Sequence, residues 1–134
     1  MSEPAVPPTN AAPDPLDDAL VLAVRYPAPG AAVLQVDGEL DALTCGRFGR
    51  RALALLDDRP ELIIDLSQVR FMDSSALRVL IVAHDAAQVR QGQLYVVTGD
   101  AAIVVWPVKR TALDRLLRLH PDLSDALAAL TPHG

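Results

Sequence analysis

Two adjacent serine hydroxyl groups lie at the predicted start of a helix, a position at which a protein can carry an exposed phosphate group. The sequence reads Asp73-Ser74-Ser75 directly after an apolar segment and directly before a long helical pattern. Asp and Ser are preferred at helix N-termini, because a side-chain oxygen can accept a hydrogen bond from a free backbone N–H. Those N–H groups and the helix dipole also favour negative charge. A serine here is therefore a candidate phosphate acceptor, and plain helix capping without modification is the alternative.

The elements on either side must position these serines. Residues 62–66 form a compact apolar run that predicts a buried strand, continuing to about Val69. A helix is predicted from Ser74 to about Gln91, with Gly92 as a C-terminal cap signal. The first half of this helix is apolar nearly all round and only Arg78 interrupts it. Such a helix is either widely buried or presents part of its face to a partner.

The N-terminal half predicts a hairpin followed by a helix. Residues 19–26 and 31–40 alternate as strands around a Pro/Gly turn, and the helix covers residues 44–57, with Asp41 or Thr44 as its cap. Cys45 falls on the apolar face, where we expect a core thiol. Basic residues occupy the other face, which is either a solvated surface or a contact for an acidic partner: Arg47, Arg50 and Arg51.

The C-terminal half predicts shorter elements. A strand at residues 94–98 precedes a helical segment at 101–113, which Pro107 must kink or shorten because it lacks an N–H. Residues 116–119 predict a short edge strand, and Pro121 is expected to open the last helix. Alternation of strands and helices predicts an α/β fold with a mixed sheet of four to five strands and about four helices, mainly on one face.

One domain is expected in 134 residues. Residues 1–18 contain five prolines and predict a disordered Pro/Ala-rich tail, with a docking segment as the alternative; the domain covers 19–131, and 132–134 form a C-terminal tail. The formal net charge of −5 argues against a nucleic-acid surface. No signal peptide and no membrane span are recognisable, so a soluble cytoplasmic protein is expected.

The sequence offers little evidence for catalysis or for a bound cofactor. The single cysteine and three dispersed histidines offer no metal site, and no phosphate-binding glycine loop indicates a nucleotide cofactor. A Ser-His-Asp hydrolase is the one candidate chemistry, but the sequence has no G-x-S-x-G elbow. The nearest histidine, His84, lies roughly 14 Å along the helix by its rise per residue. We therefore expect no enzyme activity.

Three motifs resemble the STAS domain, and within it the bacterial anti-sigma factor antagonists. Gly38-Glu39-Leu40-Asp41 is similar to the family's GELD at the end of the second strand. Residues 62–66 followed by 71–77 resemble its strand and D-S-S/T-G-L motif. Residues 113–117 with 121–130 resemble its ending, so the resemblance covers about residues 19–130.

The resemblance implies partner switching. The unphosphorylated antagonist binds an anti-sigma factor that is also a serine kinase; phosphorylation releases it, and a PP2C-type phosphatase resets it. By position the acceptor is Ser75, with Ser74 as the fallback. Ala76 stands where the family has Gly, so its methyl is expected beside the approach to the hydroxyl. Residues expected to bind the partner are Asp73, Ser74, Ala76, Leu77, Arg78, Glu39 and Asp41.

The resemblance also leaves an alternative open. A STAS module can act without switching, as a scaffold in a signalling complex or as a subunit of a lipid-transport system, and a serine that is never phosphorylated would favour this role. A weak homodimer is compatible with either function. In the switching protein, Glu39 and Asp41 are expected near the serine turn, where they would repel a phosphoserine.

Overall fold

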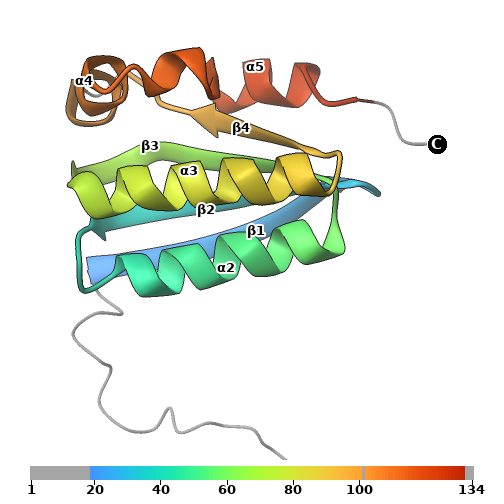
Figure 1. Cartoon of the computed structure of the whole chain (residues 1–134), viewed down its shortest axis with the longest axis horizontal. Coiled ribbons are helices and arrows are strands. Elements are labelled where there is room, and N and C mark those ends of the chain that lie inside the picture. The colour runs from blue at the N-terminus through green and yellow to red at the C-terminus, as the bar shows by residue number, and fades with distance from the viewer. Residues whose placement is uncertain (1–18, 101, 132–134) are drawn as a thin grey trace, which may run out of the picture.

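The computed structural model describes residues 19–100 and 102–131, and the predicted tails, 1–18 and 132–134, lie outside this range. Five strands form one mixed sheet in the order β1-β2-β3-β4-β5 (Figure 1). The β1–β2 pair is antiparallel, as a hairpin requires, and the other pairs are parallel. The strands are β1 (Leu20–Ala28), β2 (Ala31–Leu40), β3 (Glu61–Met72), β4 (Gln93–Val97) and β5 (Arg118–His120).

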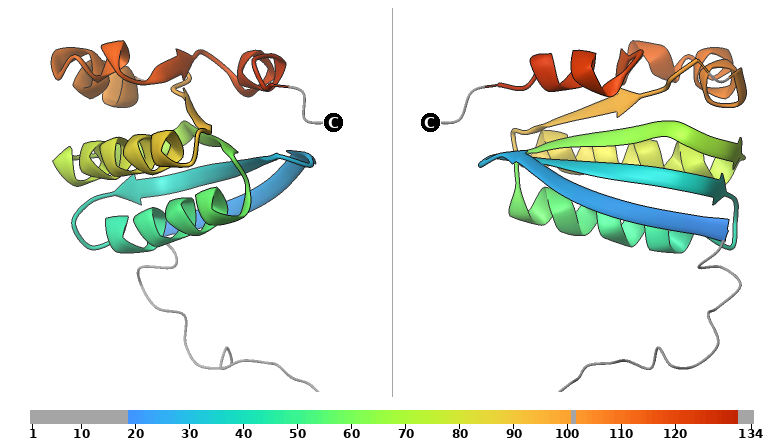
Figure 2. Two further views of the ribbon diagram at one scale, coloured as in Figure 1. Left: turned by 45° about the vertical axis from the view of Figure 1, so that its right-hand side comes forward. Right: turned by 180° about the vertical axis from the view of Figure 1, so that it is seen from behind.

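The helices lie mainly on one face of this sheet, as the sequence predicted. α2 and α3 run side by side across that face, and the view from behind shows the strands in front of them (Figures 1 and 2). Within the described residues, no helix is both long and apolar enough to cross a membrane. The helical elements are α2 (Cys45–Asp58), α3 (Ser74–Val89), α4 (Ala102–Arg110), the short 3₁₀ helix η2 (Leu113–Arg115) and α5 (Leu123–Ala128).

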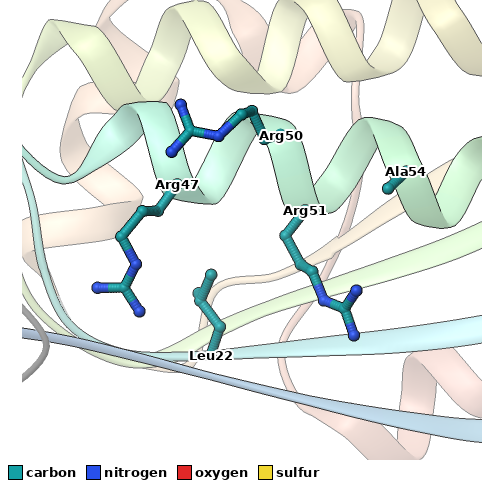
Figure 3. Close-up of a pocket in the computed structure, with 5 residues that line it drawn as sticks. All are labelled: Leu22, Arg47, Arg50, Arg51 and Ala54. Carbon is teal, nitrogen blue, oxygen red and sulfur yellow. The ribbon is translucent and has the colours of Figure 1, made fainter. Parts of the chain in front are cut away.

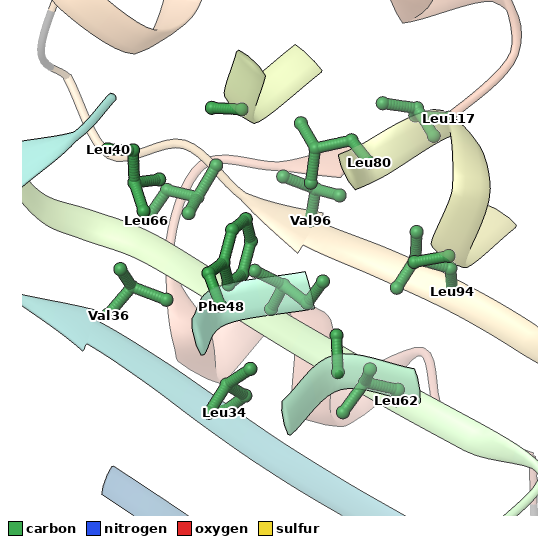
Figure 4. Close-up of a cluster of buried hydrophobic side chains, with 14 of the residues drawn as sticks. Leu34, Val36, Leu40, Phe48, Leu62, Leu66, Leu80, Leu94, Val96 and Leu117 are labelled. Carbon is green, nitrogen blue, oxygen red and sulfur yellow. The ribbon is translucent and has the colours of Figure 1, made fainter. Parts of the chain in front are cut away.

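The core has two parts because successive strand residues point to opposite faces. Leu34, Leu62 and Val96 point to the α2–α3 face, where Phe48 of α2 is fully buried among them (Figure 4). Ile63 and Tyr95 point to the other face and pack with α5 in a smaller cluster. The continuous apolar run in β3 therefore marks a strand that is buried on both faces, as a central parallel strand must be.

Two bulges in β3 keep its later residues in the core. The pairing with β2 shifts once between Gln35 and Asp37 and again between Gly38 and Glu39. Each shift inserts one extra residue in β3, so Leu66, Val69 and Met72 share the helix-covered face although they are three residues apart. A strict two-residue alternation would have turned Val69 toward the opposite face.

Several predicted boundaries in the C-terminal half need correction. α5 begins at Leu123 and not at Pro121, because the side chain of Asp122 accepts a hydrogen bond of 2.8 Å from the N–H of Asp125 and so caps the helix. β5 begins at Arg118, two residues later than expected. α4 contains Pro107 and ends at Arg110, so the helix is shorter than predicted, as the missing N–H implied.

The end of α3 also differs from the prediction. The helix ends at Val89, and Gln91 takes the left-handed conformation (φ 59°) that Gly92 was expected to supply. Gly92 is needed for another reason: a Cβ at this position would lie 1.9 Å from the carbonyl oxygen of Pro60. This close approach joins the end of α3 to the start of β3, where the N–H of Gln93 also donates to Pro60.

Candidate functional site

The serine turn lies at the carboxyl ends of β2 and β3. The last pairs in the register are Glu39 with Phe71 and Leu40 with Met72, directly before α3 begins. The N–H of Asp73 then donates a hydrogen bond of 3.1 Å to the carbonyl oxygen of Leu40. This bond fixes the start of α3 against the end of β2, so the GELD segment and the serine turn form one surface.

Asp73 is the N-cap of α3, as predicted. Its backbone is extended, and its side-chain Oδ1 accepts a hydrogen bond of 2.8 Å from the N–H of Ser75. Its carbonyl oxygen accepts another, of 3.1 Å, from the N–H of Ala76. The cap therefore satisfies one of the free N–H groups of the first turn and sets the direction in which the two serines leave the strand.

The two serines differ in exposure. Ser74 is exposed and Ser75 is half-buried. Within residues 19–100 and 102–131, neither hydroxyl has a hydrogen-bond partner, so neither is committed to a structural role. Both lie in the first turn of α3, where the helix dipole favours a negative group. The geometry is compatible with phosphate on either residue.

The charges of two carboxylates near this turn act on the same buried thiol. Burial chiefly, and then the charges of Asp73 and Asp41, raise the pKa of Cys45 to about 11. Cys45 is a core residue with 6% of its surface exposed, as the sequence predicted. Asp41 directly follows Leu40, whose carbonyl oxygen accepts the hydrogen bond from the N–H of Asp73, so Asp41 is close to the serine turn in the chain trace.

The GELD carboxylates have different surroundings. Glu39 is exposed, whereas Asp41 is half-buried and its Oδ1 accepts hydrogen bonds from the N–H groups of Leu43 (2.9 Å) and Thr44 (3.1 Å). Thr44 occupies the N-cap position of α2 without a side-chain bond to the helix, and its hydroxyl instead donates to the carbonyl oxygen of Glu39 at 2.7 Å. Asp41 therefore holds the loop that leads into α2.

The residues after the serines separate into buried and exposed positions. Ala76 is fully buried in the main core. Its methyl therefore points away from the surface on which a kinase would approach, which corrects the expectation that it lies beside the hydroxyl. The same burial removes Ala76 from the residues that could touch a partner directly. Leu77 is half-buried against the core, and Arg78 is exposed.

Sequence reasoning did not locate a groove between α2 and α3. It encloses about 140 Å³, its lining is apolar apart from Arg78, and it begins one turn after the serines. Ile81 and Val82 are 36% and 45% exposed, so α3 does present part of its apolar face, which was one of the two possibilities that its composition left open. The groove residues are Gly49, Leu53, Arg78, Val79, Val82 and Ala83.

Comparison with known proteins identifies the family to which the chain belongs. Residues 24–126 match the STAS domain. The chain is 31% identical over 102 residues to the anti-sigma-F factor antagonist RsfB of Mycobacterium tuberculosis, an alignment that covers 75% of this chain and 82% of RsfB. The chain therefore belongs to the STAS domain family, which confirms the resemblance seen in its motifs.

Solved structures agree with this assignment. An anti-sigma factor antagonist from Mycobacterium paratuberculosis superposes with a TM-score of 0.76 at 32% identity, over 84% of this chain and 94% of that one. SpoIIAA in its unphosphorylated form gives a TM-score of 0.68 at 13% identity, over 84% and 100% of the two chains. The phosphorylated form of Bacillus SpoIIAA gives 0.64 at 13%, over 81% and 97%. The SpoIIAA likeness shows the fold alone, and it is the predicted one.

Proposed function

We propose that this chain is an anti-sigma factor antagonist that binds its partner in the unphosphorylated form and is released by phosphorylation of Ser75. The relatives RsfB and the Mycobacterium paratuberculosis protein are both described as antagonists, and both are more than 30% identical to this chain. The observation that carries the proposal is the serine at the first turn of α3, whose hydroxyl has no partner among the described residues and whose N–H is capped by Asp73.

The partner in this proposal is an anti-sigma factor with serine kinase activity. The kinase transfers the γ-phosphoryl group of ATP to Oγ of Ser75, ADP leaves, and the hydroxyl proton passes to a base of the kinase. A PP2C-type phosphatase hydrolyses the ester and restores the serine. The chain itself is a binding protein and not an enzyme in this cycle, and it acts in the cytoplasm, where sigma factors meet RNA polymerase.

The charge added by phosphorylation explains release. A phosphoserine carries about −1.5 to −2 charges at neutral pH. On Ser75 this charge would lie beside the carboxylate of Asp73, which already accepts from the N–H of Ser75, and close to Asp41, which follows the Leu40 carbonyl bonded to the N–H of Asp73. A partner packed on this surface would remove water from all three groups and raise the cost of their repulsion. Phosphorylation therefore weakens the complex with little change in the domain.

The binding surface in this proposal joins the serine turn to neighbouring exposed groups. Asp73, Ser74, Leu77 and Arg78 lie at the start of α3, with Glu39 and Asp41 at the end of β2. Ala76 supports this turn from the core and makes no direct contact. The apolar groove between α2 and α3 continues the same surface, which gives a partner a hydrophobic contact next to a charged one.

Affinity measurements on substituted chains test the proposal. Ser75→Ala is expected to bind the anti-sigma factor and to resist release by ATP, whereas Ser75→Asp should bind at least about tenfold more weakly, or about 1.4 kcal/mol. Ser74→Asp is the matched control, because it places the same charge one residue away on an exposed side chain. Equal affinity of Ser75→Ala and Ser75→Asp would favour the non-switching STAS module instead.

A further inference from the structure

The exposed face of α4 carries a large aromatic side chain next to two cations. This helix lies on the β4 side of the sheet, away from α2 (Figures 1 and 2). Trp106, the only tryptophan of the chain, is 63% exposed. Lys109 and Arg110 follow it by three and four residues, so all three side chains share one face of the helix, and both cations are exposed. The opposite face is held in the core by Val104 and Val108, which are fully buried.

The described part of the chain does not use these groups for its own stability. Within residues 19–100 and 102–131, no carboxylate pairs with Lys109, Arg110 or the nearby Arg115, and the ring of Trp106 contacts no other ring or guanidinium. Arg115 follows α4 closely, because its N–H donates to the carbonyl oxygen of Ala112, whose own N–H donates to that of Lys109, each at 3.1 Å. Cations in the last turn also offset the helix dipole, but that role does not explain an exposed tryptophan beside them.

Positive charge is concentrated in this part of an acidic chain. Residues 102–118 contain four of the 12 basic residues and only one of the 17 acidic residues. The remaining residues are therefore predominantly acidic. An anionic surface attracts the segment and repels the rest of the molecule, which orients the domain with α4 toward that surface. Salt screens charges beyond about 8 Å at physiological ionic strength, so the nearest cations dominate the attraction.

The size and composition of the α4 face fit a lipid surface better than a protein. Tryptophan prefers the boundary between lipid headgroups and acyl chains, and lysine and arginine are attracted to anionic headgroups. A helix of nine residues is about 14 Å long and about 10–12 Å wide. Its exposed face is thus far smaller than the roughly 800 Å² that each partner buries in a stable protein complex. Peripheral contact with a bilayer needs only an interfacial aromatic side chain and a few cations.

We propose that the α4 face, formed by Trp106, Lys109 and Arg110, docks on the surface of an anionic lipid bilayer. The indole ring lies at the level of the headgroups, and the two cations, with Arg115 beside them, contact lipid phosphates. Each cation is expected to strengthen vesicle binding about fivefold, so the contact is weak and reversible. This inference does not depend on Ser75 or on the proposed partner. An acidic segment of a protein is the competing occupant, and the test separates the two.

Tryptophan emission of the full chain tests the docking, because Trp106 is the only tryptophan. Vesicles of phosphatidylcholine and phosphatidylglycerol in equal amounts should shift the emission to shorter wavelength, and vesicles of phosphatidylcholine alone should not. Lys109→Gln/Arg110→Gln should weaken binding to the anionic vesicles by about tenfold or more. Arg50→Gln/Arg51→Gln is the matched control: it removes the same charge from a separate groove between α2 and β1 and should change binding much less (Figure 3).

Co-sedimentation with the same vesicles extends the test to Trp106→Ala, which emission cannot follow. This side chain is exposed, so its removal should change stability little while weakening vesicle binding. Unchanged emission with anionic vesicles would overturn the proposal, as would equal losses of binding in the two double variants or undiminished binding by Trp106→Ala. An emission shift produced by polyglutamate and not by the vesicles would also overturn it, because the occupant would then be an acidic protein segment.

Discussion

The carboxylate of Asp73 accepts a hydrogen bond of 2.8 Å from the backbone N–H of Ser75, so the N-cap of α3 also places a negative charge beside the proposed phosphate. One side chain thus serves two purposes. It stabilises the helix start in the unmodified protein, and it provides like-charge repulsion once a phosphate is added.

Removal of this cap should weaken the domain measurably. Asp73→Ala is expected to lower the free energy of unfolding by about 1 kcal/mol, because the N–H of Ser75 loses its acceptor. Asp73→Asn is the control, since its amide oxygen can still accept the bond while the charge is lost. Urea unfolding of both variants measures the difference. If Asn costs as much as Ala, the charge of Asp73 and not its hydrogen bond stabilises the start of α3.

The thiol of Cys45 should make stability fall at alkaline pH. Its pKa is raised from 9.0 to about 11, so between these values the thiol ionises in the unfolded chain and stays protonated in the folded one. The contribution of the protonated thiol to the free energy of unfolding is fully present below pH 9 and is lost as the pH rises through about 11. Its size is about 2 to 3 kcal/mol.

Urea unfolding of the protein and of Cys45→Ala at pH 8 and pH 11 isolates this effect. The alanine variant lacks the thiol, so its stability should fall by less over the same interval, although its absolute stability is lower because of the cavity. Parallel losses in the two proteins would show that the thiol is not responsible. Tyr95 also contributes to the alkaline loss in both proteins, since burial, and then its hydrogen bond to Glu61, raise its pKa to about 12.

Glu61 attaches the C-terminal segment to the sheet. Its Oε2 accepts a hydrogen bond of 2.6 Å from the hydroxyl of Tyr95, and its Oε1 accepts one of 3.0 Å from the N–H of Thr131. Tyr95→Phe removes one donor to a buried carboxylate and should cost about 1–3 kcal/mol. Tyr26→Phe, at an exposed tyrosine, is the control and should change stability by less than about 0.5 kcal/mol.

Hydrogen exchange at the N–H of Thr131 shows whether Tyr95→Phe loosens the C-terminal segment locally or only lowers the stability of the whole domain. If Glu61 holds the segment as described, exchange of the Thr131 N–H should accelerate in Tyr95→Phe by more than the loss of global stability accounts for. Unchanged stability in Tyr95→Phe would contradict the role assigned to the buried carboxylate.

Gly38 is required where β2 passes the start of β1. Its φ is +131°, and a Cβ would lie 2.1 Å from the carbonyl oxygen of Ala19. Gly38→Ala should therefore cost more than about 3 kcal/mol, because backbone strain and a backbone clash add. Gly46→Ala in α2 is the control: its Cβ would meet only the flexible end of Arg50, and alanine favours the helix. Thermal unfolding of both variants checks this, and a mild effect of Gly38→Ala would contradict the register given for β2.

The sequence predicted those elements in which the local residue pattern favours the same structure that the packing of the whole domain requires. Asp73 has the residue type of an N-cap and is one, and the apolar run of β3 is a strand buried on both faces. It did not predict the bulges of β3, because the pairing with β2 decides where an extra residue is accommodated. Nor did it predict that Ala76 is buried, because the start of α3 is apolar nearly all round and its pattern does not select the side that packs on the core.

The surfaces were less predictable than the core. The composition of α3 left a partner-facing surface open, but the groove with α2 depends on how two helices far apart in sequence pack together. The arginines of α2 were recognisable as one helix face, whereas their position over the edge of β1 required the sheet order. Ser74 and Ser75 remain distinguished by the family motif and by their exposure.

The most direct test of the proposed switch is a phosphopeptide map of the protein purified from its own host. Phosphate on Ser75 is the predicted result, and it would direct the search to an anti-sigma factor with kinase activity. Phosphate on Ser74 would keep the mechanism and move the site by one residue. Absence of phosphate under growth and stress, and again after incubation with host kinases and ATP, would contradict the switch and favour a constitutive binding module.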